Sequence, residues 1–476
     1  MTDAAATPPD APEEPEPWTR LLPGPLRTIV ARFFPQGAIL LAVVTFGSYG
    51  LGLVRDVVQA RTFGAGPDLD AYNAAFAIPE IALGVLVASG LSAPFVPIFL
   101  ALRGEQEQAA NDFAGTVLTL AILIIGVATP ILFVLAPLTV DFVGPGFDAG
   151  QRALYVDLFR LMLVTPVLFA VSDVLGEVLV AERRFLGYAL APVLYNGGIV
   201  VGTILLAPSQ GIFGPAIGAI LGAIAHLGIR IVGLRGSRIR FRPALRVRTR
   251  AFREFVRLVL PRMASHPIDP LAFTLLGSLA TTLAVGGLSS LSFARNFQSV
   301  PVSVIAVSFA LAVFPTLSSL AAAGDRRAFT RIVVRNVAAI AVLTTLAAAA
   351  LAILSGFVID FFFRSETFTE HDVQRTQLML MVMCLAIPFE SVTHLLSRAI
   401  FATRNTLLQV LASLTAFGVT IAAAFALAPS IGLVAVPLGF AIGMIAKAGL
   451  LAIALVPRIR SLRPGETREE LLGEAG

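Results

Sequence analysis

The fold of this chain is decided by residues 47–97, GSYGLGLVRDVVQARTFGAGPDLDAYNAAFAIPEIALGVLVASGLSAPFVP, in which two apolar segments flank a short Gly/Pro/Asp connection. The first apolar segment carries three charged residues, Arg55, Asp56 and Arg61. An arginine at the centre of a membrane helix costs roughly 2.5–3.5 kcal/mol. A sequence keeps such a residue where it is paired, hydrated, close to the interface or needed for function.

The composition is that of a membrane protein. Of the 476 residues 57% are hydrophobic and 14% are charged, against about 25% charged in soluble domains. One cysteine and four scattered histidines give no disulfide framework and no metal site, and we find no catalytic motif of a known enzyme class. We therefore expect a transporter without cofactor rather than an enzyme.

A membrane-spanning helix needs about 20 mostly apolar residues. This length predicts an all-α polytopic membrane protein with about twelve transmembrane helices, at 38–61, 71–101, 111–136, 151–181, 187–206, 211–234, 255–282, 287–320, 331–360, 374–401, 406–427 and 432–456. The Pro- and Glu-rich residues 1–36 predict a disordered tail, and residues 458–476 predict a second tail.

Arginines collect in alternate connections, above all in the basic segment 236–252. The positive-inside rule then places both termini in the cytoplasm. The segment 236–252 is predicted to be a cytoplasmic linker that contacts lipid headgroups. The basic pI of about 9.9 is explained in this way without a nucleic-acid partner.

The chain repeats itself at an offset of 221 residues. Arg183 corresponds to Arg404, Gly211 to Gly432, and the motif LAPS at 206–209 recurs at 427–430. Each unit holds about six spans, an even number, so both units enter the membrane from the same side. This predicts two parallel six-helix lobes, 37–235 and 253–457, with a binding site near the midplane between them.

The first helix offers two interpretations. Arg55 and Asp56 point about 100° apart on a helix, so we expect them not to pair with each other. Arg55 and Arg61 either lie near the interface and extend their head groups to water, or Arg55 attracts an anionic group in a hydrated cavity. Asp70, at the start of the next helix, is either an N-cap or a gate residue.

Later charges extend the list of candidates. Glu80 directly follows a proline and is either a cation or proton site or the partner of an arginine. Asp269 lies in LPRMASHPIDPLAF, a proline-broken helix of the kind in which transporters place cation sites. Arg295 has no acid nearby in sequence and is a second candidate anion anchor. Lys447, the only lysine, is expected to extend along its helix towards water.

Three motifs carry a family resemblance. RDVVQARTFGAGPDLDAYNAAFAIP (55–79) with SAPFVPIF (92–99), ARNFQSVPVSVIAVSFALAVFPTLS (294–318) and AERRF (181–185) resemble the MurJ (MviN) lipid II flippases of the MOP transporter superfamily, which includes MATE-like folds. The resemblance implies that the chain moves an undecaprenyl-pyrophosphate-linked peptidoglycan precursor across the bacterial cytoplasmic membrane by alternating access. It also implies coupling to the membrane potential, Na⁺ or H⁺.

The resemblance assigns roles by position. Arg55, Asp56 and Asp70 match motif residues, and Arg295 falls one place from a motif arginine. With Arg61 they imply a site for a lipid-linked anionic substrate, with Asp56, Asp70, Glu80 and Asp269 in gating or ion coupling. Tyr49 and Leu83 stand where family members carry arginines, and many members have fourteen spans.

The implied partners are the substrate, membrane lipids and other cell-wall synthesis proteins. The alternatives are a flippase or exporter of another lipid-linked oligosaccharide or small amphiphile, and a transport-inactive envelope scaffold.

Overall fold

A computed structural model describes residues 38–87, 92–237, 239, 241–265, 267–403 and 405–462. Within these ranges all regular structure is helical and no strand occurs, as predicted for an all-α protein. The predicted tail 1–36 and residues 463–476 lie outside the described residues, as do His266 and Arg404 of the sequence motifs.

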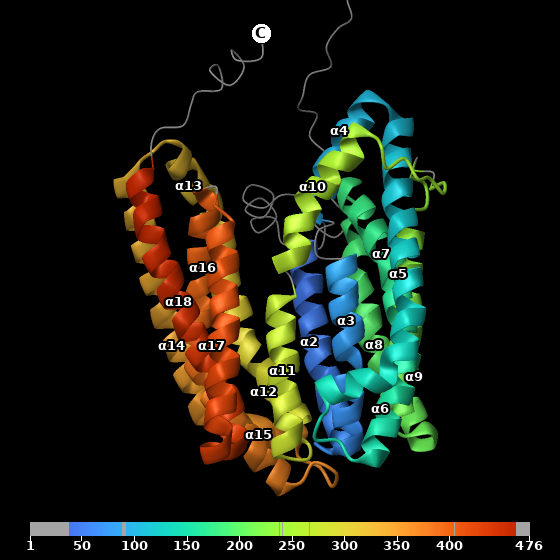
Figure 1. Cartoon of the computed structure of the whole chain (residues 1–476), viewed down its shortest axis with the longest axis vertical. Helices are drawn as coiled ribbons and strands as arrows, with labels where there is room; N and C mark the ends of the chain where they lie inside the picture. Colours follow the sequence, from blue (N-terminus) through green and yellow to red (C-terminus); the bar gives the residue numbers. More distant parts are fainter. Residues whose placement is uncertain are drawn as a thin grey trace, which may run out of the picture.

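The chain forms two consecutive sets of helices (Figure 1). The first set consists of α2 (Ala38–Phe63), α3 (Pro67–Leu86), α4 (Ser92–Glu105), α5 (Glu107–Val143), α6 (Ala149–Met162), α7 (Val164–Ala181), α8 (Phe185–Gln210) and α9 (Phe213–Gly233). The second set consists of α10 (Arg250–Ser265), α11 (Ile268–Leu283), α12 (Gly287–Pro301), the π-helix η3 (Val302–Val307), α13 (Ser308–Ala322), α14 (Arg326–Phe363), α15 (Glu370–Met383), the short 3₁₀ turns η4 (Cys384–Ala386) and η5 (Gly432–Val434), α16 (Ile387–Ala402), α17 (Leu407–Ile431) and α18 (Ala435–Ser461).

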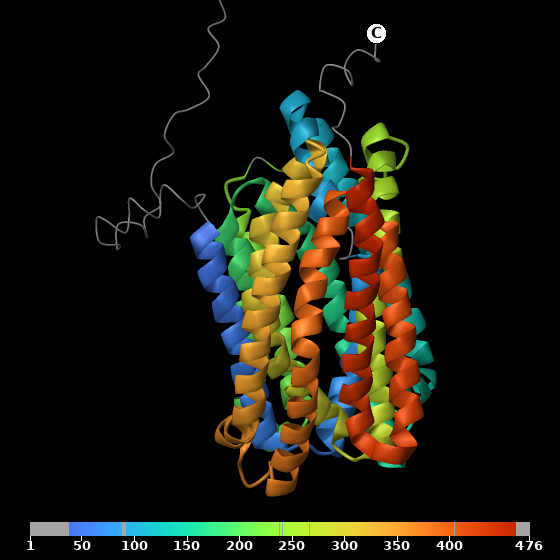
Figure 2. The same cartoon turned by 90° about the vertical axis from the view of Figure 1, so that its left-hand side faces the viewer.

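These helices account for the predicted spans. In the described part of the chain, nine helical runs are long and apolar enough to cross a membrane. One of them, Leu407–Ser461, contains both α17 and α18, which lie side by side and turn back at Gly432 (Figures 1 and 2). The 26-residue α2 and the broken pair α10–α11 supply the remaining two passes. The prediction of about twelve spans is therefore confirmed, and several of them are broken into two helices.

The long helices α5 and α14 present apolar side chains to the outside of the molecule. Val134 and Leu138 on α5 are 72% and 68% exposed, and Ile353 on α14 is 82% exposed. In water such a surface would promote aggregation, whereas in hydrocarbon it is solvated at no cost. The helices also satisfy their own backbone hydrogen bonds, as a membrane requires.

The two sets of helices share local structure at the offset found in the sequence. Gly211 after α8 and Gly432 after α17 both adopt φ 57° and ψ −136°, a backbone conformation that favours glycine. Capping boxes start α6 at Asp148 and α15 at Thr369, again 221 residues apart. The repeat is therefore structural, and it relates one lobe to the other.

The lobes lie side by side, the first on the right of Figure 1 and the second on the left. We call the end that contains connections 64–66, 144–148, 284–286 and 364–369 the gate end (bottom of Figure 1). The opposite end, with α4, α10, α13 and the connection between α9 and α10, is the linker end.

The connection between α9 and α10 runs along α5. The backbone amides of Ala244 and Arg246 donate to the hydroxyls of Thr119 and Thr116. The Phe255 ring of α10 then packs against Phe113 of α5, with ring centroids 5.5 Å apart. The predicted second lobe, 253–457, thus begins with a segment that joins the core of the first lobe.

The helices α8 and α9 pack closely because glycines line their interface, the small-residue pattern of membrane helix pairs. A Cβ on Gly202 of α8 would lie 2.5 Å from the Cα of Gly218 and 2.6 Å from the carbonyl oxygen of Gly214, both on α9. The backbone of the partner helix cannot yield as a side chain can. The distance between the two helices therefore depends on these glycines.

We expect Gly202→Ala to lower the apparent melting temperature of the detergent-purified protein, because overpacking costs about 1–3 kcal/mol. Gly228→Ala on α9 is the matched control, since a Cβ there meets no atom within 4 Å. Thermal unfolding followed by size-exclusion chromatography measures both. Equal melting temperatures for the two variants would contradict the close packing.

Candidate functional site

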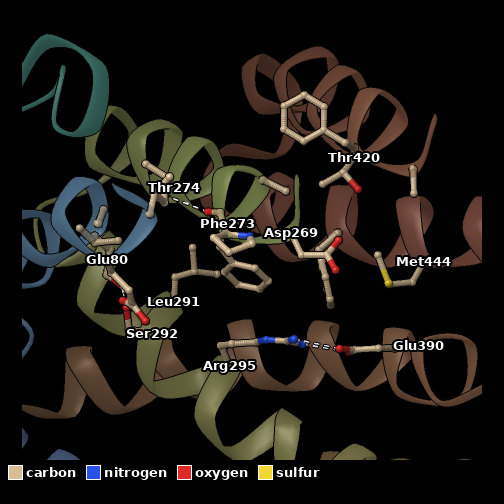
Figure 3. Close-up of a pocket in the computed structure, with 18 of the residues that line it drawn as sticks. Glu80, Asp269, Phe273, Thr274, Leu291, Ser292, Arg295, Glu390, Thr420 and Met444 are labelled. Carbon is tan, nitrogen blue, oxygen red and sulfur yellow. Dashed lines mark hydrogen bonds and ion pairs between the residues drawn. The ribbon is translucent and has the colours of Figure 1, made fainter. Parts of the chain in front are cut away.

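A cavity of about 500 Å³ lies between α3 of the first lobe and the helices α11, α12, α16, α17 and α18 of the second lobe (Figure 3). Its wall is largely apolar, with side chains such as Phe273 and Leu291. Five charged side chains interrupt this wall. One of them, Glu80, belongs to α3, and the other four belong to helices of the second lobe: Asp269, Arg295, Glu390 and Lys447. The predicted location between the lobes thus contains a hydrophobic cavity with charges of both signs.

Arg295 of α12 lines the cavity and is held by an acid, an amide and two aromatic rings. Its two terminal nitrogens donate to the two carboxylate oxygens of Glu390 on α16, at 2.9 and 2.8 Å, and one of them also contacts Gln298. Its guanidinium carbon lies 4.7 Å from the ring centroid of Phe273 and 4.9 Å from that of Phe440. The acid that was missing near Arg295 in sequence is therefore Glu390, 95 residues later.

Arg55 and Asp56 do pair, so the expectation from their angular separation is wrong. Nε and Nη2 of Arg55 donate to Oδ1 of Asp56 at 3.0 and 2.8 Å, because the long arginine stem bends back along the helix surface. Nη1 donates to Asn196 of α8. The second oxygen of Asp56 accepts a hydrogen bond from Asn296 of α12, in the other lobe, at 2.5 Å. Asp56 therefore links Arg55 to the second lobe.

Arg61 lies in the last turn of α2, next to the connection 64–66 of the gate end, and not among the residues that line the cavity. Its Nε and Nη2 donate to the backbone carbonyl oxygens of Phe362 and Phe361, at 2.7 and 2.9 Å. These carbonyls end α14, where the helix dipole favours a cation. Arg61 thus fastens the end of α2 to the second lobe.

Asp70 joins the two lobes at the gate end. Its own helix, α3, follows the N-cap residue Gly66 and has no side-chain cap. The Asp70 carboxylate instead accepts from the backbone N–H of Gly286 and of Ser289, both at 2.7 Å, and from the Ser289 hydroxyl at 2.6 Å. It caps α12 of the opposite lobe, where the helix dipole favours an anion. Asp70 is therefore an N-cap, but of a helix in the opposite lobe and not of its own, and its role as a gate residue stays a prediction.

Further contacts at the gate end reinforce this closure. The Arg375 side chain donates to the carbonyl oxygen of Ala65 at 3.0 Å, and the Gly146 amide donates to the Thr281 hydroxyl at 3.3 Å. All of these hydrogen bonds connect one lobe to the other. The gate end is therefore closed by polar contacts.

Asp269 and Lys447 form an ion pair across the second lobe. The helix break predicted around the prolines falls between α10 and α11, and Asp269 occupies the first turn of α11. The Lys447 nitrogen lies 3.6 Å from Oδ1 of Asp269, with the lysine buried and the aspartate exposed to the cavity. The expectation that Lys447 extends towards water is wrong, because an acid on a neighbouring helix holds it inside.

Glu80 stands apart from these pairs. It is exposed in the cavity and, among the described residues, has no hydrogen-bond partner, although it interacts electrostatically with Arg55. Figure 3 places it across the cavity from Asp269. No group of three His, Cys, Asp or Glu side chains in the described ranges is arranged for a metal ion.

The two positions without the family's arginines contribute no charge. Tyr49 is 62% exposed on α2, and Leu83 packs against the apolar core formed by α4, α5 and α7. Neither residue lines the cavity.

Sequence reasoning missed Glu390 and Lys447 as members of these ion pairs and Asn296 as the hydrogen-bond donor to Asp56. Each is a polar residue inside an apolar helix, which is the signal that marks it. Their partners lie on other helices, far away in sequence, so spacing gives no indication of the pairing.

Two helical lobes related by a parallel repeat, a charged cavity between them and a polar closure at one end define a multi-pass membrane transporter of two-lobe architecture. A family model described as "Lipid II flippase MurJ" matches residues 59–470. The chain belongs to this family, whose members are transporters rather than enzymes.

Individual relatives agree with this assignment. The chain is 24% identical over 368 residues to a probable lipid II flippase MurJ of Borreliella burgdorferi, covering 77% of this chain and 72% of the relative. It is 26% identical over 417 residues to that of Thermotoga maritima, covering 87% and 84%.

Two solved structures share the fold. One, of lipid II flippase MurJ in an inward closed conformation, matches with a TM-score of 0.77 at 22% identity, covering 89% of this chain and 90% of the other. An inward-facing MATE transporter of the MOP superfamily matches with a TM-score of 0.75 at 16% identity, covering 87% and 94%.

We expect Arg295→Ala to lower the apparent melting temperature, because it leaves the buried Glu390 carboxylate without its cationic partner; removing one partner of a fully buried ion pair costs about 3–5 kcal/mol, and this pair is partly exposed. The double variant Arg295→Ala/Glu390→Ala should recover part of the loss, since no lone buried carboxylate remains. Thermal unfolding in detergent measures both variants.

Arg364→Ala is the control, because its pairs with Asp360 and Glu370 are exposed and exposed pairs contribute little. A melting temperature of Arg295→Ala equal to that of the control would argue against the buried pair.

Proposed function

We propose that this protein flips lipid II, an undecaprenyl-pyrophosphate-linked peptidoglycan precursor, across the bacterial cytoplasmic membrane by alternating access. The observation that carries the proposal is the charged cavity between two repeat-related lobes that hydrogen bonds close at the gate end. Membership of the MurJ family supports lipid II as the substrate.

The orientation follows from charge. The arginine-rich connection between α9 and α10 lies at the linker end, and the positive-inside rule places such loops in the cytoplasm. We infer that both termini are cytoplasmic and that the gate end faces the periplasm. The closed gate then separates the cavity from the periplasm, the arrangement needed to load substrate from the inside.

The diphosphate of the substrate needs cationic partners. We assign this role to Arg55 and Arg295, which lie on the two sides of the lobe interface and are each paired with an acid when no substrate is bound. Arg61 we assign to closure of the gate, because it binds the end of α14.

We further propose that Asp56, Glu80 or Asp269 couples transport to the membrane potential, Na⁺ or H⁺. Each is an acid in the cavity or at the lobe interface, where a cation or a proton can compensate its charge. Proteoliposomes with an imposed potential, Na⁺ gradient or pH gradient measure the coupling. A flipping rate independent of all three would exclude it.

Complementation tests the substrate. Expression in cells depleted of their own lipid II flippase should restore growth. Arg55→Ala should abolish lipid II flipping in proteoliposomes, because the first lobe loses the cation that we assign to the diphosphate, while the variant still inserts into the membrane. Arg152→Ala, which removes an exposed ion pair with Asp141, should flip normally.

Other outcomes identify other functions. Flipping of another lipid-linked oligosaccharide with no transport of lipid II would support a different exporter of the superfamily. Full activity of Arg55→Ala would argue against the anion role. A scaffold that recruits other cell-wall synthesis proteins would instead lose its function on deletion of residues 1–25, which a flippase should tolerate.

The gate makes a separate prediction. Asp70→Asn loses the negative charge at the N-terminus of α12 and at least one of three hydrogen bonds, so the gate end should open more often. A cysteine at Ala77, which lines the cavity, reports this opening through its labelling by a membrane-impermeant thiol reagent added to whole cells. The native Cys384 is buried.

Labelling of the Ala77→Cys protein should become about tenfold faster with Asp70→Asn, the factor that corresponds to about 1.4 kcal/mol. Asp68→Asn is the matched control, because Asp68 is exposed on the same first turn. Equal labelling rates in the two variants would refute a gating role for Asp70.

A further inference from the structure

Lys447 presents a buried positive charge to the cavity wall. It lies on α18, and its side chain is 8% exposed. Burial of an ammonium group away from water is costly unless partners replace the lost hydration. An ammonium carries three N–H donors, so it has the capacity to bind several oxygen atoms at once.

The partner in this structure satisfies little of that capacity. Among the described residues, the charged partner of Lys447 is Asp269, with the nitrogen 3.6 Å from Oδ1. This distance is longer than a hydrogen bond. The ammonium is thus compensated in charge but not in hydrogen bonds.

Asp269 is free to move away. Its side chain is 72% exposed, and it sits in the first turn of α11, directly after the helix break. In Figure 3 the Asp269 carboxylate lies clear of the Arg295–Glu390 pair, towards Thr420 and Met444. Hydration of the carboxylate in the cavity lowers the cost of separating it from the lysine.

Arg295 differs from Lys447 in how firmly its carboxylate partner is held. Its carboxylate partner, Glu390, is buried, binds both terminal nitrogens and is also held by Gln298. The rings of Phe273 and Phe440 contact its guanidinium group. A substrate anion would have to break a part-buried bidentate pair to gain Arg295, whereas at Lys447 it displaces one exposed carboxylate.

We propose that Lys447 is the exchangeable anion-binding group of the second lobe, and that the diphosphate of the substrate takes the place of the Asp269 carboxylate on its ammonium group. The inference deepens the proposed function and rests on it. Asp269 then acts as a competitor that compensates the lysine while the cavity holds no substrate. Arg295 stays paired with Glu390 and acts as a partner of the diphosphate only through the electrostatic attraction of its charge, while Lys447 makes the direct contact.

The proposal predicts effects of opposite sign at the two members of one ion pair. Lys447→Gln should weaken binding of lipid II to the purified protein by about tenfold or more, the factor for about 1.4 kcal/mol, which is less than one charged hydrogen bond contributes. Lys447→Arg should retain binding. Asp269→Asn should strengthen binding, because the competing carboxylate is gone while the ammonium remains.

If the ion pair had only a structural role, Lys447→Gln and Asp269→Asn would both weaken the binding of lipid II, since either substitution breaks the pair. The titration uses lipid II in detergent with the full-length protein, and size-exclusion profiles verify that each variant folds. Arg331→Gln and Asp360→Asn, both at exposed positions of α14, change the net charge in the same two directions and should leave the affinity unchanged.

The outcomes separate the two proposals. If the wild-type protein binds no lipid II, the proposed function fails. If it binds and Lys447→Gln binds equally well, the role of Lys447 is overturned while the proposed function stands. If Asp269→Asn bound lipid II more weakly and had a normal size-exclusion profile, the proposed competition between the Asp269 carboxylate and the diphosphate for Lys447 would likewise be overturned.

Discussion

The high cost of placing charge in hydrocarbon organises this molecule. Three cations of different burial each meet an acid or a carbonyl oxygen of another helix: the partly buried Arg295 meets Glu390, the buried Lys447 meets Asp269, and the exposed Arg61 meets the end of α14. Because these partners come from different helices, the pairs hold the helices in register. They also concentrate charge at the lobe interface, where a transporter needs it.

The charges are divided between two places with different chemistry. At the gate end, Asp70 binds backbone and hydroxyl groups of α12, and these contacts are made between the two lobes. In the cavity, acids and bases compensate each other within the second lobe. A change of the lobe angle therefore breaks the gate contacts but leaves most cavity pairs intact. Asp56 makes contacts of both kinds: it pairs with Arg55 within the first lobe and accepts a hydrogen bond from Asn296 of the second lobe.

The lobes themselves owe their form to a repeat. The same left-handed glycine, Gly211 or Gly432, ends corresponding helices, and the same capping box starts others. Glycines and capping boxes determine the backbone of only a few neighbouring residues. Because both lobes carry them at corresponding positions, both lobes form the same turns. The cavity, in contrast, is asymmetric: most of its charged residues belong to the second lobe.

The sequence by itself determined the twelve spans, the repeat and the family, because apolar length, turn residues and motifs are local properties. It also indicated Arg55, Asp70, Glu80, Asp269 and Arg295 as unusual charges. Only the tertiary structure decided their partners. Asp70 caps a helix 216 residues away, Arg295 pairs with Glu390, and Lys447 stays inside to meet Asp269. The physical reason is that ion pairs between helices depend on packing, which no spacing along the chain encodes.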